Sequence, residues 1–236
     1  MSRPALLNNV DHKELRIATA RGAAFGDDVM VAFTFPAEFR DLQAHYPIVF
    51  SKSADGTSFH PLALLGLTEG ENLFLDENGW DAPYIPLAIA RQPFLIGTGA
   101  GGLTVHVDLD HPRAGAADGE PVFLPHGGNT EFLERASAML LTLHEGMQAT
   151  PAFVAALAEH ALLESFVLDI EGPDGSQNRL AGFYTINEDR LAALGAAALE
   201  RLHKAGYLQA IYMAVASLSQ LRPLIERKQR RDAGHA

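Results

Sequence analysis

The first half of the chain alternates short apolar runs with turn-forming residues. Residues 47–52 and 58–66 are two such runs, and a polar loop containing Asp55 and Gly56 separates them. Apolar runs on either side of an Asp-Gly loop are typical of an antiparallel β-hairpin. The pattern therefore predicts a hairpin over residues 47–66.

A second hairpin is predicted directly after the first. Residues 71–76 and 80–85 flank Asn78-Gly79, a dipeptide that favours the positive φ angles of a tight turn. Two prolines in and just after the last run cannot donate to a strand ladder, which places that segment at an edge or a bulge. Together the two hairpins predict a meander of three or four strands.

Further short strands and two loops complete the first half. Residues 94–96 and 103–107 are β-branched or apolar apart from His106 and predict strands, with a glycine-rich loop at 97–102 between them. Residues 113–119 are rich in glycine and alanine. We expect both glycine-rich segments to be surface loops.

Near residue 129 the period of the apolar positions changes from two to 3.6, which predicts a helix that begins at Asn129 or Thr130. Its apolar face is formed by Phe132, Ala136, Met139, Leu140, Leu143 and Met147. Thr150 followed by Pro151 is typical of a helix start, so we expect a second helix from there to about His160.

The remaining elements follow in quick succession. Residues 164–171 and 179–186 predict another hairpin, and Asn187 is the expected N-cap of a helix that ends at Gly195. Residues 196–204 predict a short helix.

The last helix is apolar around most of its circumference. Apolar residues recur every three or four positions from 208 to 221, and few long charged side chains interrupt them. Such a helix belongs in the core or in a homodimer interface. Pro223 is expected to bend or stop it, and residues 228–236 to form a basic, solvated tail, with binding to an anionic surface as the alternative.

These elements predict an α+β fold. An antiparallel, meander-rich half over residues 12–125 is expected to pack against a mainly helical half over 129–227, with the hairpin at 164–186 inserted. At 236 residues, we expect one domain over 1–236.

Composition narrows the function classes. Acidic residues outnumber basic ones by 29 to 18, for a net charge of −11, which argues against a nucleic-acid partner. The chain has no cysteine, which excludes disulfide scaffolds, thiolate metal sites and cysteine nucleophiles. The most apolar stretch, at 207–221, is shorter than the roughly twenty residues of a membrane span. Without a signal-peptide pattern either, the expected compartment is the cytoplasm.

No motif identifies a catalytic centre, a metal site or a cofactor. Gly97, Gly99 and Gly102 have the spacing of a dinucleotide-binding loop, but a predicted strand follows them instead of a helix. His106 and Asp108 lie on the same face of a predicted strand, as two ligands of a non-haem iron oxygenase would. The third ligand would be His126, His144 or His160. A metal-dependent oxygenase using His106 and Asp108 is therefore the alternative function.

The leading hypothesis is a binding protein, based on an aromatic and polar cluster around the second hairpin. The cluster comprises Asn72, Phe74, Trp80, Asp81, Tyr84 and Arg91. Aromatic rings on an edge strand, flanked by amide and acid groups, can stack on a sugar ring or hold a peptide. The structural alternative is that the single tryptophan closes one end of the core.

The same region resembles the bacterial SapC family. The matching segments are residues 46–50, 63–67, 71–75, 79–86 and 92–94 in the first half, and 180–187, 199–203, Gly206 and Ser217 in the second. The resemblance covers roughly residues 10–227. It implies an association with bacterial surface layers, by the family's name, and supplies no catalytic residue. Together with the cluster it favours a non-catalytic binding or accessory protein whose partner is a protein, a peptide or a glycan.

Overall fold

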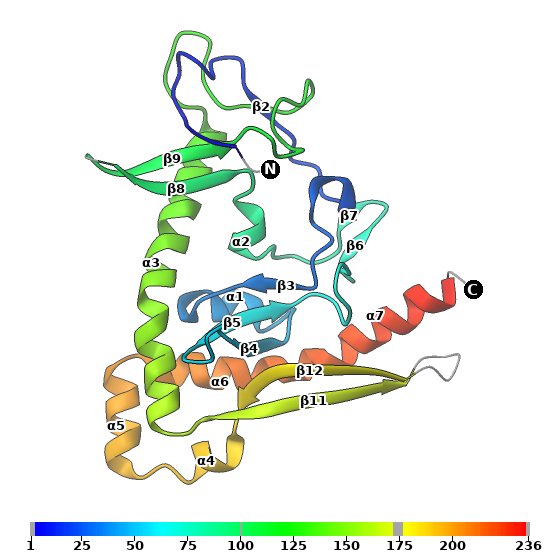
Figure 1. Cartoon of the computed structure of the whole chain (residues 1–236), viewed down its shortest axis with the longest axis vertical. Coiled ribbons are helices and arrows are strands. Elements are labelled where there is room, and N and C mark those ends of the chain that lie inside the picture. The colour runs from blue at the N-terminus through cyan, green and yellow to red at the C-terminus, as the bar shows by residue number, and fades with distance from the viewer. Residues whose placement is uncertain (1–2, 100, 172–176, 235–236) are drawn as a thin grey trace. The chain divides into compact units, whose positions relative to one another are not determined.

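The computed structural model describes residues 3–99, 101–171 and 177–234 (Figure 1). Antiparallel strands dominate the N-terminal part and helices the C-terminal part, so the α+β prediction is confirmed. The chain forms two compact units. The first unit comprises Met1–Asp27, Leu75–Asp81 and Leu87–Glu145, and the second comprises Asp28–Phe74, Ala82–Pro86 and Gly146–Ala236. A single domain over the whole chain stays a prediction.

The first unit contains three small antiparallel sheets. The three-stranded sheet has the order β1-β9-β8, from β1 (Pro4–Leu6), β9 (Gly102–Asp108) and β8 (Phe94–Gly99). The two-stranded sheets pair β2 (Arg16–Ile17) with β10 (Glu120–Pro121), and β6 (Leu75–Asp76) with β7 (Gly79–Trp80). Short helical turns are η1 (Ala23–Phe25) and α2 (Leu87–Ala90).

One apolar cluster forms the core of the first unit. It consists of Ile17, Phe94, Val107, Val122, Phe123, Leu133, Ala136 and Leu140. The strands predicted at 94–96 and 103–107 are confirmed, and both extend further into the glycine-rich segment. The segment 113–119 is not wholly a surface loop, because the Arg113 side chain is only 1% exposed.

A five-stranded antiparallel sheet organises the second unit, in the order β11-β12-β4-β5-β3. Its strands are β3 (Val31–Phe33), β4 (Ile48–Lys52), β5 (Phe59–Leu64), β11 (Leu163–Glu171) and β12 (Gln177–Ile186). Both the 47–66 and the 164–186 hairpins are thus confirmed, although residues 172–176 of the second turn lie outside the described residues. The second hairpin extends the sheet of the first, because Tyr184 of β12 pairs with Phe50 of β4.

The predicted continuous meander is wrong. β6 and β7 are only two residues long and pair with each other, while the neighbours of the β4-β5 hairpin are β12 and β3. The chain turns before β6 because the Asn72 side chain accepts a hydrogen bond from the backbone N–H of Phe74 at 3.0 Å. A local side-chain bond of this kind competes with strand pairing.

Residues 131–159 form one long helix, α3 (Glu131–Glu159), and not two. Pro151 lies inside it, and Thr150 does not cap a new helix but donates from its hydroxyl to the carbonyl of Gly146 at 2.8 Å. Proline removes one backbone hydrogen bond from a helix. Phe153 and Leu157, both fully buried, continue the apolar face beyond it, and their burial offsets that loss.

Two short helical segments in the second unit, η2 (Pro36–Glu38) and α1 (Phe39–Leu42), were not predicted. The C-terminal helices follow the predicted order and are α4 (Glu188–Ala192), α5 (Ala196–Lys204), α6 (Tyr207–Ser217), η3 (Leu218–Gln220) and α7 (Leu221–Gly234). Asn187 caps α4 as predicted, accepting from the N–H of Arg190 at 2.8 Å. α6 packs on the five-stranded sheet (Figure 1), where Ser217 accepts a hydrogen bond from the Ile48 N–H.

The predicted basic tail is instead the continuation of a helix. Pro223 lies in the first turn of α7, where a missing N–H costs no helical hydrogen bond, so the helix continues through Gly234. Lys228 is held within the second unit by Glu71, with 2.9 Å between Nζ and Oε1. Residues 235–236 lie outside the described residues. In the described part of the chain, no helix combines the length and apolar character needed to cross a bilayer.

Candidate functional site

The six residues predicted to bind a ligand are divided between the two units. Trp80, Asp81 and Arg91 belong to the first unit, and Asn72, Phe74 and Tyr84 to the second. Within each unit the structure gives these side chains definite neighbours.

Asn72 and Phe74 are interior residues of the second unit, 2% and 4% exposed. The Phe74 ring meets the Tyr46 ring edge-on, with 4.6 Å between centroids, and the Arg227 guanidinium lies 4.5 Å from the Phe74 centroid. Asn72 shapes the backbone turn through its bond to the Phe74 N–H. Both side chains therefore support the fold around them, and neither is open at the surface.

Tyr84 is anchored to a buried carboxylate. Its hydroxyl donates to Glu38 Oε1 at 3.0 Å, and the Thr34 hydroxyl donates to Oε2 of the same group at 2.6 Å. Burial raises the pKa of Tyr84, and the negative charge of Glu38 raises it further. The Tyr46 hydroxyl donates to the Tyr84 carbonyl. Tyr84 is thus a neutral hydrogen-bond donor that holds its segment against η2 of the same unit.

The three residues in the first unit are more accessible. Trp80, in β7, is half-buried and pairs with Leu75, while Asp81 is exposed. Arg91 donates from Nη1 to the Phe94 carbonyl at 2.7 Å, and burial lowers its pKa. Arg91 therefore holds the start of β8, and the ligand-binding role of all six residues stays a prediction.

The oxygenase alternative gains no support from the geometry. His106 Nε2 lies 3.2 Å from Thr104 Oγ1, and Asp108 Oδ1 accepts the backbone N–H groups of Arg3 and Asp110. Within residues 3–99, 101–171 and 177–234, no group of three or more histidine, aspartate or glutamate side chains is arranged to hold a metal ion.

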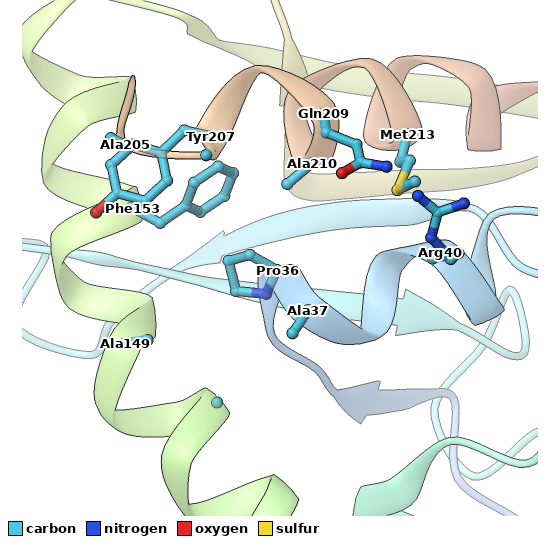
Figure 2. Close-up of a pocket in the computed structure, with 12 residues that line it drawn as sticks. Pro36, Ala37, Arg40, Ala149, Phe153, Ala205, Tyr207, Gln209, Ala210 and Met213 are labelled. Atoms are coloured by element: carbon cyan, nitrogen blue, oxygen red, sulfur yellow. The ribbon is translucent and has the colours of Figure 1, made fainter. Parts of the chain in front are cut away.

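A pocket that the sequence did not predict lies in the second unit. It has a volume of about 270 Å³ and opens between the η2-α1 segment, α3 and α6. Figure 2 shows the Phe153 and Tyr207 rings at one end and Arg40 with Met213 at the other, with Gln209 on the α6 side. The two rings meet edge-on, with 5.4 Å between centroids.

Small residues shape this pocket. A side chain at Gly146 would collide with the ring of Phe35, so glycine is required for α3 to approach that ring. Gly206 adopts a φ of 77°, in the left-handed region that favours glycine, and turns the chain from α5 into α6. A glycine inside a helical pattern often marks a close approach. Gly146, inside a helical pattern, is therefore the sequence feature that could have indicated a close approach at this pocket.

Two polar side chains at the pocket have free hydrogen-bonding groups. Arg40 is exposed, and within the described residues no carboxylate pairs with it. Gln209 is also exposed and carries both a donor and an acceptor. The rest of the lining is apolar or aromatic, apart from the Tyr207 hydroxyl. The pocket can therefore hold an apolar group next to an anionic or amide group.

Comparison with known proteins gives one match. The family model described as SapC matches residues 7–224 of the 236-residue chain, which includes most of both units. Neither the curated proteins nor the solved structures contain a match.

Proposed function

The chain belongs to the SapC family, and we propose that it is a non-catalytic binding or accessory protein that recognises a peptide segment of a partner protein. The site is the second-unit pocket between Phe153 and Arg40. The recognised segment carries an apolar side chain next to a carboxylate.

Arg40 is the observation that carries this proposal. In a chain with a net charge of −11 and 29 acidic residues, this guanidinium at the rim of an apolar pocket has no carboxylate partner among the described residues. A cation left without an internal partner beside an apolar pocket complements an acidic group of a ligand. The charge at the pocket is therefore opposite in sign to that of the chain as a whole.

Gln209 favours a peptide over a glycan at this pocket. Its amide can donate to a backbone carbonyl and accept from a backbone N–H, which is the pairing that an extended peptide offers. Phe153 and Tyr207 meet edge-on, so they form a corner for an apolar side chain rather than the flat platform on which a sugar stacks.

A random-peptide library displayed on phage tests the proposal with the full chain as bait. We expect enriched peptides to contain an aromatic or aliphatic residue adjacent to Asp or Glu, with saturable binding by fluorescence polarisation. Arg40→Gln should weaken such a peptide about tenfold, because it removes a charge-assisted hydrogen bond. Arg222→Gln is the matched control, since Arg222 is exposed and pairs with Glu226.

Filling the pocket gives a second, independent readout. Ala149 lies on α3 in the pocket lining, and Ala152 is exposed on the same helix outside it. Ala149→Leu should abolish peptide binding while Ala152→Leu leaves it unchanged. If no peptide binds saturably, or if the two leucine variants bind alike, the pocket is not a peptide site.

The exposed part of Trp80, with Asp81, is proposed as a further contact with the partner. We also propose a cytoplasmic location, with surface-layer association and a homodimer as further expectations of the sequence. Trp80→Ala in a protein that still folds should remove the specific partner from a pull-down with the tagged chain. An unchanged partner profile would show that Trp80 takes no part.

A further inference from the structure

One side of α7 packs against the second unit. Leu224 on this side is only 1% exposed. The Arg227 guanidinium lies 4.5 Å from the centroid of the Phe74 ring, and Lys228 pairs with Glu71. These contacts fix the orientation of the helix about its own axis, and they leave its other side at the surface of the unit.

The outward side of α7 has a shallow hollow, of about 570 Å³, that exposes an apolar stripe. The stripe consists of Leu218, Leu221 and Ile225, and each of these side chains is only partly buried. They are three and four positions apart, so they are neighbours along one helix face. A row of apolar side chains with this spacing is the surface on which a second helix packs.

The polar side chains of the hollow are arranged so that the stripe complements its own reverse. Arg222 and Glu226 have opposite charges, and they precede and follow position 224 by the same number of residues. Ser219 and Gln229, the other two polar residues of the lining, are also equidistant from position 224. If two copies of the helix run antiparallel with position 224 at the same height, Arg222 of each faces Glu226 of the other. In the same arrangement Ser219 faces Gln229, so every polar side chain of the hollow gains a partner.

The same arrangement brings the apolar side chains together. At a rise of about 1.5 Å per residue, Ile225 of one copy lies about 3 Å along the helix axis from Leu221 of the other. These two residues from both copies form a small apolar centre, with the opposite charges on either side of it. A parallel arrangement would instead place Arg222 opposite Arg222, which is unfavourable.

We propose that the outward side of α7 is a homodimer interface, in which two copies of the helix pair antiparallel about a two-fold axis at the height of residue 224. The two-fold axis repeats each charged contact, so the interface contains two pairs of Arg222 with Glu226. One pair of short helices buries less than the roughly 1,200 Å² of a standard interface, so the dimer is weak and depends on concentration. This assigns a surface to the homodimer expected from the sequence. The peptide pocket shares no lining residue with this surface, so the two sites are independent.

Sedimentation equilibrium of the full chain tests the interface. Between about 5 and about 500 μM we expect a reversible monomer–dimer equilibrium, because association follows mass action. Ile225→Asp should weaken the dimer at least about tenfold, since it buries two carboxylates in the apolar centre. Tyr212→Asp is the matched control, because Tyr212 is 54% exposed on α6 and lies outside the lining of the hollow. A natural chain that stays monomeric throughout, or equal dimerisation of the two variants, would overturn the proposal.

Exchanging the charges tests the antiparallel register. Arg222→Glu makes both charged positions of the hollow acidic, and Glu226→Arg makes both basic, so each variant alone should remain monomeric. An equimolar mixture of the two should dimerise, because the acidic helix of one copy then faces the basic helix of the other. The ion pair between Arg222 and Glu226 within one chain is absent from both variants, so recovery in the mixture reports a contact between copies. A mixture that stays monomeric would refute the register.

The arginines of α7 also suit an anionic membrane surface, and vesicles of equal parts phosphatidylcholine and phosphatidylserine test that occupant. Glu226 in the hollow opposes it, so we expect no co-sedimentation with the vesicles. Co-sedimentation of a chain that does not self-associate would overturn the homodimer and assign α7 to a lipid surface. Peptide binding is measured with dilute, monomeric chain, so Ile225→Asp should bind the selected peptide as the natural chain does. Failure of the interface and failure of the peptide site are thereby distinguishable.

Discussion

Arg113 and Asp27 form a buried ion pair between residues 86 positions apart in the sequence, with 2.6 Å between Nη2 and Oδ2. The Arg113 side chain is 1% exposed and that of Asp27 is fully buried. Arg113 also donates to the carbonyls of Ala18 and Ala20. One side chain thus fixes the segment after β2 within the first unit.

Removing this guanidinium should strongly destabilise the protein. Arg113→Met removes the shorter of the Asp27 contacts with Arg113 and Arg21 and leaves the carbonyls of Ala18 and Ala20 without their donor. Breaking a buried pair in this way typically costs about 3–5 kcal/mol. Urea unfolding measures the loss. Arg3→Met is the control, since the exposed ion pair between Arg3 and Asp110 is worth at most about 1 kcal/mol. Similar losses of unfolding free energy in the two variants would contradict the role of Arg113.

Arg113 also shows where sequence patterns fail. Both hairpins, over 47–66 and 164–186, could be predicted, because apolar runs on either side of turn-forming residues are a local signal. The segment 113–119 gave no such signal, because a glycine- and alanine-rich run has the same composition whether it is solvated or crosses the interior. The partners that bury Arg113 lie near residue 20, and no local pattern contains that information.

The pocket in the second unit was unpredictable for the same reason. Arg40 and Gln209 line it from helices that are far apart in the chain. The continuous helix α3 shows the opposite case, in which a local sequence signal is present but misleading. Pro151 is a strong local signal for a helix start, but the burial of Phe153 on the same apolar face overrides it.

His111 should make the stability of the protein depend on pH. Burial lowers the pKa of His111, and the charge of Arg113 lowers it further, while its Nδ1 accepts the Arg113 N–H at 3.2 Å. Because the pKa of His111 is lowered only in the folded state, His111 of the unfolded chain binds a proton at a higher pH than His111 of the folded protein. This contribution to stability is therefore present above the ordinary pKa of about 6.5 and is lost as the pH falls.

Melting temperatures at about pH 8 and about pH 5 test this sign, on either side of the ordinary histidine pKa. His111→Asn should show a smaller decrease between the two conditions than the natural chain. His126→Asn, at an exposed position, should leave the decrease unchanged. A larger decrease in melting temperature in His111→Asn would show that folding raises the pKa of His111 instead of lowering it.

The C-terminal helix should contribute to stability through Lys228. Burial acts to lower the pKa of Lys228, but hydrogen bonds from its ammonium to Glu71 and Asp232 raise it overall, which indicates a net favourable environment for the charge. The side chains of Lys228 and Glu71 are only 17% and 11% exposed. Lys228→Met should therefore cost about 1–3 kcal/mol, because it leaves the Glu71 carboxylate partly buried without its cation.

Arg230→Met on the exposed face of α7 provides the comparison in the same unfolding experiment. It should change the free energy of unfolding by less than about 0.5 kcal/mol, as surface substitutions usually do. If Lys228→Met were equally neutral, residues 228–234 would behave as the solvated tail that the sequence predicted.

Ile211 distinguishes burial in the core from burial in a dimer interface. It is fully buried within the single chain, as are Ala214 and Ser217 on the same face of α6, whereas Tyr212 is 54% exposed. Ile211→Ala should cost about 2–5 kcal/mol at every protein concentration, because the cavity forms inside one chain. Tyr212→Ala should cost less than about 1 kcal/mol if its ring faces only water. A melting temperature of the natural chain that falls on dilution, together with a loss of that dependence in Tyr212→Ala, would instead place Tyr212 in a homodimer interface.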